Sequence, residues 1–249
     1  MPSVEQLSDQ LGSSDQAKVY QAKRALAEQT SAAGAPGKDK ERAELAASLA
    51  KIVAATRPKS GQDKTPVAAY SAKVRGEICR ALAAVGGDME TPALKQALAD
   101  FESREMARFA LDRMTCQAAT DALAEAAIQA VGAEFRVGVV NALGRRSGSG
   151  VVDALKKCAA DADPHVRLAA AEALANHADA SADELLVAAE KQPGDRAALR
   201  MSKARIRLAE TLVRAGQQEA GKKIYQAVAQ SNAEGPQKKA AQQALSQLG

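Results

Sequence analysis

The sequence predicts an all-α fold, and within that class an α-solenoid (an alpha-alpha superhelix) of stacked helical hairpins. Apolar residues make up 46% of the 249 residues, but many of them are Ala and only 2% are aromatic. Ala favours helix and supplies little apolar area. Strand-type runs are missing, since the nearest one, at 137–140, is interrupted by Gly138. A helical motif also recurs about every 30 to 40 residues, which is typical of a solenoid.

The clearest copy of this motif is the stretch 163–179, DPHVRLAAAEALANHAD. Asp163 is suited to cap a helix whose first residue is Pro164, because Asp accepts a hydrogen bond from a first-turn N–H and Pro has no N–H to leave unpaired. Apolar residues then follow at helical spacing from Val166 to Leu174. One such unit is too small to bury its own apolar face, so neighbouring units are expected to stack.

The motif can be aligned along the chain on its Leu position. The anchors are Leu49, Leu82, Met114, Leu143, Leu174, Leu212 and Leu245, with Leu26 as a weaker first member. A basic residue stands seven positions before most anchors: Arg42, Arg75, Arg136, Arg167, Arg205 and Lys238. The copy around Met114 departs, with Ala107 at that position. Shared columns of this kind predict packing positions rather than reactive groups.

The run D-P-x-V-R-x-x-A-A-x-A-L in this motif resembles HEAT repeats, in particular the short HEAT-like repeats of phycobilisome lyases. The resemblance extends from about residue 67 to the end and is clearest over 74–189. It implies an armadillo-like helical stack of HEAT-like hairpins. It carries little information on activity, because one fold hosts many functions.

In HEAT-like repeats the Arg and the Asp of the motif bond to the turns between repeats. Asp163 and Arg167 match both halves of that pattern. Arg75 and Arg136 match only the Arg half, since Ser71 and Gly132 stand four residues earlier, at the Asp position. The resemblance therefore implies structural roles for Asp163, Pro164, Arg75, Arg136, Arg167 and Arg205.

The first 65 residues are the least regular part of the chain. Helices are expected at 3–11, 14–29 and 39–55, with breaks at 31–38 and 57–64 that contain Pro and Gly. We expect residues 1–65 to form a helical capping region and 66–249 to form one continuous HEAT-like repeat array. Solenoids need such caps because a bare terminal repeat exposes core surface.

From residue 66 onward, helices are expected to follow one another in pairs. They are predicted at 67–85, 91–101, 103–114, 117–131, 134–143, 150–161, 164–177, 181–192, 196–214, 217–231 and 236–248. Gly86 and Gly87 suit the left-handed position after a helix, Gly132 is expected to stop the helix at 117–131, and Gly216 is expected in a turn. The last helix has no partner, so it either caps the array or continues into further sequence.

Composition and charge limit the function classes. The net charge of +4 is mild for 34 basic and 30 acidic groups, so nucleic acid is not an expected partner. No apolar run approaches the ~20 residues of a membrane span. The N-terminus shows no secretory signal, which predicts a cytoplasmic protein as the sequence stands. A secreted or periplasmic location stays open if the N-terminus is trimmed.

No catalytic, cofactor or metal residues are predicted. The three cysteines, Cys79, Cys116 and Cys158, form no C-x-x-C pair and are expected to be free thiols. His165 and His177 have no partner at metal-ligand spacing, so both are interpreted as exposed. No nucleophile elbow of the form G-x-S-x-G occurs.

Two sets of residues are candidates for partner contacts. The loop 144–150 combines glycines with Arg145, Arg146 and Ser147 before a helix N-terminus, where an anion could sit, although an ordinary inter-repeat turn is the simpler interpretation. The second helices of the pairs are expected to line a concave face. Its lysines include Lys156, Lys157, Lys222 and Lys223, and they indicate either a basic groove or a solvated face.

The sequence therefore favours a non-enzymatic protein-binding or scaffold module with a protein partner. The alternative is an enzyme or enzyme accessory of the bilin-lyase or HEAT-like DNA glycosylase type, acting in the concave groove. The glycosylases use aromatic side chains, chiefly Trp, and this chain has no Trp.

Overall fold

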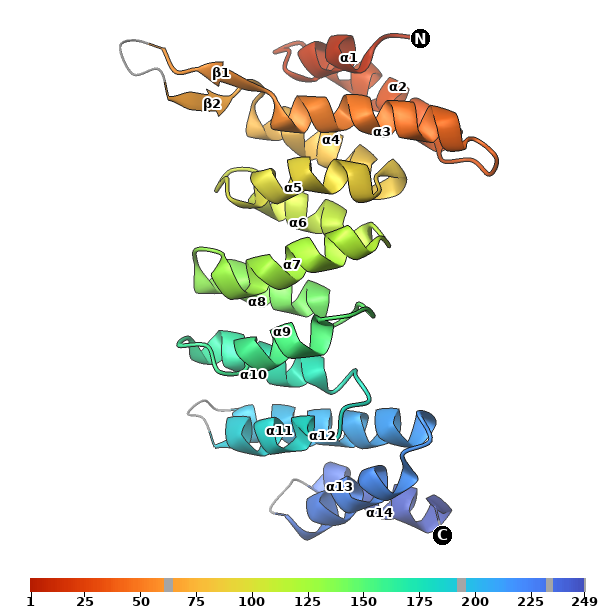
Figure 1. The fold of residues 1–249 in the computed structure, drawn as a ribbon, viewed down its shortest axis with the longest axis vertical. Coiled ribbons are helices and arrows are strands. Elements are labelled where there is room, and N and C mark those ends of the chain that lie inside the picture. The colour runs from red at the N-terminus through yellow and green to blue at the C-terminus, as the bar shows by residue number, and fades with distance from the viewer. Residues whose placement is uncertain (61–64, 192–195, 232–234, 249) are drawn as a thin grey trace. The chain divides into compact units, whose positions relative to one another are not determined.

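The chain divides into two compact units of stacked helices, Met1–Leu123 and Ala124–Gly249. The computed structural model describes residues 1–60, 65–191, 196–231 and 235–248 (Figure 1). These residues form fourteen α-helices and one short two-stranded sheet, so the predicted all-α class is confirmed.

The first unit begins with helices whose caps can be assigned to particular side chains. Ser3 and Gln6 form a reciprocal capping box on α1, Asp15 caps α2 and Ser71 caps α4. The elements are α1 Val4–Leu11, α2 Gln16–Ala33, α3 Asp39–Ala54, β1 Thr56–Pro58, β2 Pro66–Ala68, α4 Ala72–Val85, the 3₁₀ turn η1 Asp88–Glu90, α5 Thr91–Leu98 and α6 Arg104–Arg113. The boundary between the units falls inside α7, Gln117–Gln129.

The second unit contains the best-formed copy of the motif. Asp163 caps α10 by accepting hydrogen bonds from the N–H groups of His165 and Val166, and Pro164 is the first helical residue. The elements are α8 Ala133–Leu143, α9 Val151–Cys158, α10 Pro164–Leu174, α11 Ala182–Glu190, α12 Ala197–Arg214, α13 Gln218–Gln230 and α14 Gly235–Leu248.

Each unit is built from two layers of helices. In the first unit α4 packs against α2 and α6, while α3 packs against α1 and α5. In the second unit α10 packs against α8 and α12, and α12 against α14. The helices α9, α11 and α13 alternate with them along the chain and pack against their sequence neighbours. Each unit is therefore the helical-hairpin stack of an α-solenoid.

The Leu anchors form the core of these stacks. Leu82, Leu143, Leu174 and Leu212 are completely buried, whereas Leu245 on the terminal helix α14 is only half-buried. Most outward residues of α14 are polar, as expected of a helix at the end of a stack.

The alignment of the first repeats was wrong in one respect. Leu49 is completely buried, but it lies on α3, which packs in the layer of α1 and α5. The helix in the layer of α4 is α2, which carries Leu26. Arg42 accordingly belongs to no arginine column, and it is an exposed residue that pairs with Asp39 one turn away.

A small sheet replaces the predicted start of the helix at 67–85. β1 and β2 pair antiparallel with Thr56 opposite Ala68 and Pro58 opposite Pro66, and α4 begins only at Ala72. Pro66 cannot donate a hydrogen bond, and Ser71 offers a helix cap five residues later. Residues 61–64 of the predicted break, and residue 192 at the expected end of the helix from 181, lie outside the described residues. The division into a cap of residues 1–65 and an array of 66–249 stays a prediction.

Candidate functional site

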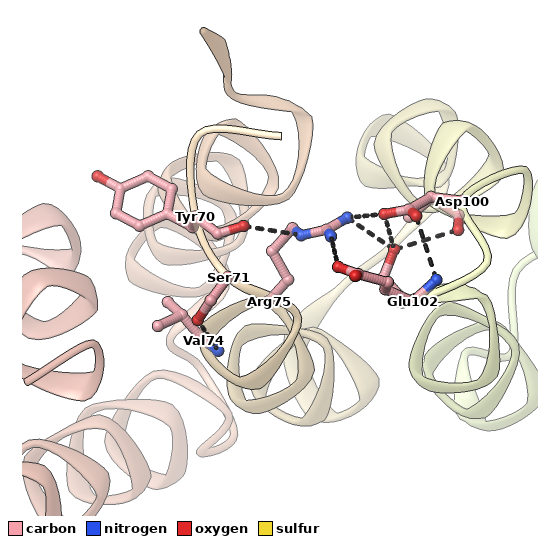
Figure 2. A network of polar contacts seen from close by, with 8 residues as sticks. Tyr70, Ser71, Val74, Arg75, Asp100 and Glu102 are labelled. Atoms are coloured by element: carbon pink, nitrogen blue, oxygen red, sulfur yellow. Dashed lines mark hydrogen bonds and ion pairs between the residues drawn. The ribbon is translucent and has the colours of Figure 1, made fainter. Parts of the chain in front are cut away.

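An arginine of the motif joins two turns in the first unit. The Arg75 side chain is nearly buried at the start of α4, and its Nε donates to the backbone oxygen of Tyr70, 3.1 Å away. Its Nη1 donates to the carboxylate of Asp100 and, at 2.7 Å, to Oγ of Ser103. Figure 2 shows the guanidinium between the turn before α4 and the turn after α5, with the ring of Tyr70 pointing away.

The carboxylate of Asp100 is fully engaged in this network. Ser103 Oγ donates to it at 2.8 Å, and the N–H of Glu102 donates at 3.1 Å. Burial alone would raise the pKa of Asp100, but the hydrogen bonds from Arg75, Ser103 and Glu102 outweigh it and lower the pKa. Asp100 is therefore a structural anion rather than a proton donor at neutral pH.

The second unit repeats this arrangement at Arg136. Nη1 of Arg136 donates to the backbone oxygen of Ala130 at 3.1 Å, and Nη2 donates to Oδ1 of Asp161 at 2.9 Å. Arg167 then donates from Nη1 to the backbone oxygens of Asp161 and Ala162, both at 2.8 Å. Asp161 thus links the arginines of two successive repeats. Its pKa would be raised by burial but is lowered by the N–H of Asp163 and by Arg136.

Arg205 on α12 bonds to a neighbouring helix rather than to a turn. Its Nε and Nη2 make a two-pronged contact with the carboxylate of Asp183 on α11, at 2.6 and 3.0 Å. The side chain of Arg205 is only 7% exposed. Arg75, Arg136, Arg167 and Arg205 therefore each bond to a turn or to a neighbouring helix.

A hollow of about 640 Å³ lies beside the Arg75 network. Its walls include the two β-strands, Arg75, Gln96 and Asp100. Arg75 and Asp100 at its edge are already bonded to one another, and Arg57 of β1 also lines it. This hollow therefore resembles a contact surface more than a catalytic site with a paired acid and base.

Two further hollows lie between helices. One of about 520 Å³ runs between α2 and α4, where Glu77 accepts ion pairs from Lys23 at 2.6 Å and from Arg80 at 2.8 Å. Burial would raise the pKa of Glu77, but these two cations lower it. The other, of about 370 Å³, is lined by residues of α12, α13 and α14, including Tyr225.

The predicted loop at 144–150 joins α8 to α9. Gly144 packs against α10, and a Cβ at this position would lie 2.5 Å from that of Ala173. Gly150 has the left-handed φ of 78° that precedes α9. Arg145 and Ser147 are exposed and Arg146 is half-buried. An anion contact in this loop stays a prediction.

The predicted lysines are not all available to a partner. Lys156 pairs with Asp179 at 2.6 Å, which lowers the pKa of Asp179, and Lys222 lies 3.9 Å from Glu219. Lys157 and Lys223 are exposed. Helices α11 and α12 lie between α9 and α13 in the second unit, so the two lysine pairs are not brought together (Figure 1).

The structure changes the interpretation of one histidine. His165 is exposed as expected, but His177 is half-buried, and its Nε2 is enclosed with no hydrogen-bond partner among the described residues. Burial lowers the pKa of His177. In the described ranges, no three His, Cys, Asp or Glu side chains gather as a metal site would require.

The three cysteines differ in burial. Cys79 and Cys158 are buried free thiols, and burial raises the pKa of Cys79 to about 12 and that of Cys158 to about 11. Cys116 is half-buried, and its Sγ lies 3.9 Å from Oγ1 of Thr91. Among the residues that the structure describes, no helix has the length and apolar character needed to cross a membrane.

A row of basic residues on α12 was missed from the sequence. The row consists of Arg196 at the N-cap and Arg200, Lys203, Arg207 and Arg214 within the helix, spaced by three, four or seven residues outside its core face. The helical spacing of these cations is visible in the sequence. The row is absent from the predicted contact residues, because a binding face is expected there only on the second helix of each pair.

The comparison with protein families matches residues 120–203 to HEAT repeats. This segment covers about a third of the chain and includes the clearest copy of the motif. No curated protein matches the chain.

Several solved structures are similar over most of the chain. An engineered protein is 21% identical, with 98% of this chain and 72% of that chain covered and a TM-score of 0.43. The complex of CpcE and CpcF of phycocyanin lyase from a Nostoc species is 19% identical, with 100% and 95% covered and a TM-score of 0.42. Importin beta is 13% identical, with 98% and 44% covered and a TM-score of 0.44.

All three TM-scores are below 0.5. The identification of HEAT repeats therefore depends on the family match and on the packing of the helices themselves. The match coincides with α8, α10 and the arginine contacts that join their turns. The chain contains HEAT repeats across residues 120–203.

Proposed function

We propose that this chain is a non-enzymatic protein-binding or scaffold module. Stacked helical repeats present a large preformed surface, which is how such arrays hold protein partners. The observation that carries the proposal is that carboxylates among the described residues are engaged in structural contacts with arginines. The carboxylates of Asp100, Asp161 and Asp183 are each bonded to an arginine that fixes a turn or a neighbouring helix.

An active site needs convergent polar groups whose pKa values suit proton transfer. The carboxylates with shifted pKa values here are shifted downward by hydrogen bonds and ion pairs, which keeps them ionised and weakly basic. Buried Cys79 and Cys158 are held as thiols, the form that does not react as a nucleophile. These properties support a binding role over a catalytic one.

The alternative role, an enzyme or accessory of the bilin-lyase or HEAT-like DNA glycosylase type, stays a hypothesis. It requires a groove that encloses a small molecule or a flipped base. In the described residues the exposed aromatic side chains are Tyr20, Phe101 and Phe109, and all three lie in the first unit. Phe101 and Phe109 are each covered on one side by an arginine.

The proposal is tested by affinity capture of the tagged chain from its source cell, followed by mass spectrometry and nucleic-acid staining of the retained material. We expect a protein to be retained at stoichiometric amount after nuclease treatment. Retention of nucleic acid alone, with strong dependence on salt, would overturn the proposal. A chain with Leu174→Asp, which disrupts the core, serves as the control for nonspecific retention.

A further inference from the structure

The cations of α12 form one continuous row on the solvent side of the helix. An α-helix turns by about 100° per residue, so Arg196, Arg200, Lys203, Arg207 and Arg214 lie within about 60° of arc over a length of about 27 Å. Four of the five side chains are exposed and Arg200 is half-buried. Arg205, the structural arginine, points to the opposite face and is buried.

Charge is concentrated around this helix. Residues 196–249 contain ten Lys and Arg against three Asp and Glu, a net charge of +7. The whole chain has a net charge of +4, so the preceding 195 residues carry −3. The mild overall charge therefore conceals a strongly basic C-terminal part. Such an asymmetry attracts partners of opposite charge.

Few of these cations are neutralised within the described residues. Arg200 makes a two-pronged contact with Glu172 of α10, with both distances 2.7 Å. Arg207 donates to the amide oxygen of Asn176 at 3.4 Å rather than to a carboxylate. Lys203 has no ion pair among the described residues. The one acidic residue in the row is Glu210, whose carboxylate lies 3.9 Å from Arg214.

We propose that this row, Arg196 to Arg214 on the exposed face of α12, binds an acidic segment of a protein partner. The inference rests on the proposed protein-binding function and specifies the chemistry of the partner. Charge complementarity along about 27 Å of helix would steer the encounter and fix the register of Asp and Glu side chains.

Two other anionic partners fit the surroundings less well. Single-stranded nucleic acid is held by aromatic stacking as well as by charge. The only aromatic residue after position 195 is Tyr225, and it is 3% exposed. A membrane surface also needs apolar side chains that insert beside the cations. None of the exposed large apolar residues lies between 196 and 248 in the described part of the chain.

The test measures binding of a fluorescein-labelled, 20-residue Glu- and Asp-rich peptide to the full chain by fluorescence anisotropy at physiological salt. The variant chain combines Lys203→Gln, Arg207→Gln and Arg214→Gln, because Gln keeps good helix propensity. We expect its Kd for the peptide to rise by about tenfold or more and the affinity of the unaltered chain to fall as salt is added.

The matched control combines Lys18→Gln, Lys51→Gln and Lys73→Gln, which remove the same charge from exposed helix positions of the first unit. We expect less than about a twofold change in Kd for this control. The single change Glu210→Gln removes the one acidic group of the row and is expected to tighten binding about twofold. That change also keeps the inference testable if the triple variant loses helix content in circular dichroism.

Three results would overturn the inference. The first is the absence of saturable peptide binding, and the second is equal weakening by the two triple variants. The third is tighter binding of a 20-nucleotide poly(U) RNA, or of phosphatidylserine vesicles, through the same three residues. If affinity capture retains the same protein on the α12 variant as on the unaltered chain, the inference fails and the proposed function stands. If the unaltered chain captures no protein, the proposed function itself fails.

Discussion

Arg75 shows how a single residue holds successive turns together. Its guanidinium is buried and shared among a backbone oxygen, a hydroxyl and a carboxylate. We expect Arg75→Ala to lower the free energy of unfolding by about 2–3 kcal/mol, since hydrogen bonds to charged groups are lost and a half-buried carboxylate loses its partner. Urea denaturation followed by circular dichroism measures the change.

Arg42 is the matched control for this substitution. Arg42 also stands seven residues before a Leu in the sequence, but it lies on α3 in the other layer, and its exposed side chain pairs with Asp39. We expect Arg42→Ala to change the free energy of unfolding by less than about 0.5 kcal/mol. Equal losses for the two substitutions would contradict the structural role of Arg75.

The cysteines differ in their expected reactivity. Cys79 and Cys158 are buried, and burial raises their pKa values to about 12 and about 11, so neither supplies thiolate at neutral pH. Cys116 is half-buried. We expect a thiol reagent such as DTNB to modify one cysteine in the native chain and three in urea. Rapid modification of all three in the native chain would show that the core around Cys79 and Cys158 opens.

The engaged carboxylates predict the response to acid. The pKa of Asp100 and that of Asp161 are lower in the folded chain than in the unfolded chain. Their contribution to stability is therefore complete above the unfolded pKa of about 3.9 and is lost as pH falls through the lower folded values. We expect the free energy of unfolding to fall below about pH 4, and to fall less steeply in Asp161→Asn. An identical slope for the variant would contradict the assignment.

At the scale of single elements, the close packing of α8 against α10 requires a residue without a side chain at position 144. Gly144 ends α8 with an ordinary helical φ of −64°, but a Cβ there would lie 2.5 Å from the Cβ and 3.1 Å from the Cα of Ala173. We expect Gly144→Ala to destabilise the chain by about 1–3 kcal/mol, because α10 must move away. Thermal unfolding measures this change.

Gly235 provides the comparison for Gly144. A Cβ at Gly235, the first residue of α14, would meet nothing within 4 Å. We expect Gly235→Ala to be neutral or slightly stabilising, since Ala restricts the unfolded chain. A loss of stability at Gly235 equal to that at Gly144 would show that the close approach of α8 to α10 is not the cause.

Much of the element order was predictable from the sequence. The helices α8, α10 and α12 begin within a residue or so of their predicted starts, because caps, Pro and Gly act locally. The strands β1 and β2 were not predictable, since each has only three residues and exists by pairing with the other. The layer to which α3 belongs was also mispredicted. Helices of both layers bury Leu at similar spacing, so only the packing of the helices distinguishes the two layers.

The candidate site was less predictable than the fold. The motif position of Arg75 and Arg136 could be identified, but their acidic partners lie 25 residues further on, at Asp100 and Asp161. A contact between two turns depends on how the repeats stack, which no local pattern encodes. The basic row of α12 does have a local pattern, because its cations lie at helical spacing and are therefore visible in the sequence alone.

At the scale of the whole molecule, the central claim is that this chain binds a protein on exposed helix faces rather than a small molecule in a hollow. Hydrogen exchange of the chain with and without its captured protein tests this claim most directly. We predict added protection along α12 and at least one neighbouring helix of the second unit, with the turns around Arg75 unchanged. Protection confined to the residues that line one hollow, produced by a small molecule without any protein, would contradict it.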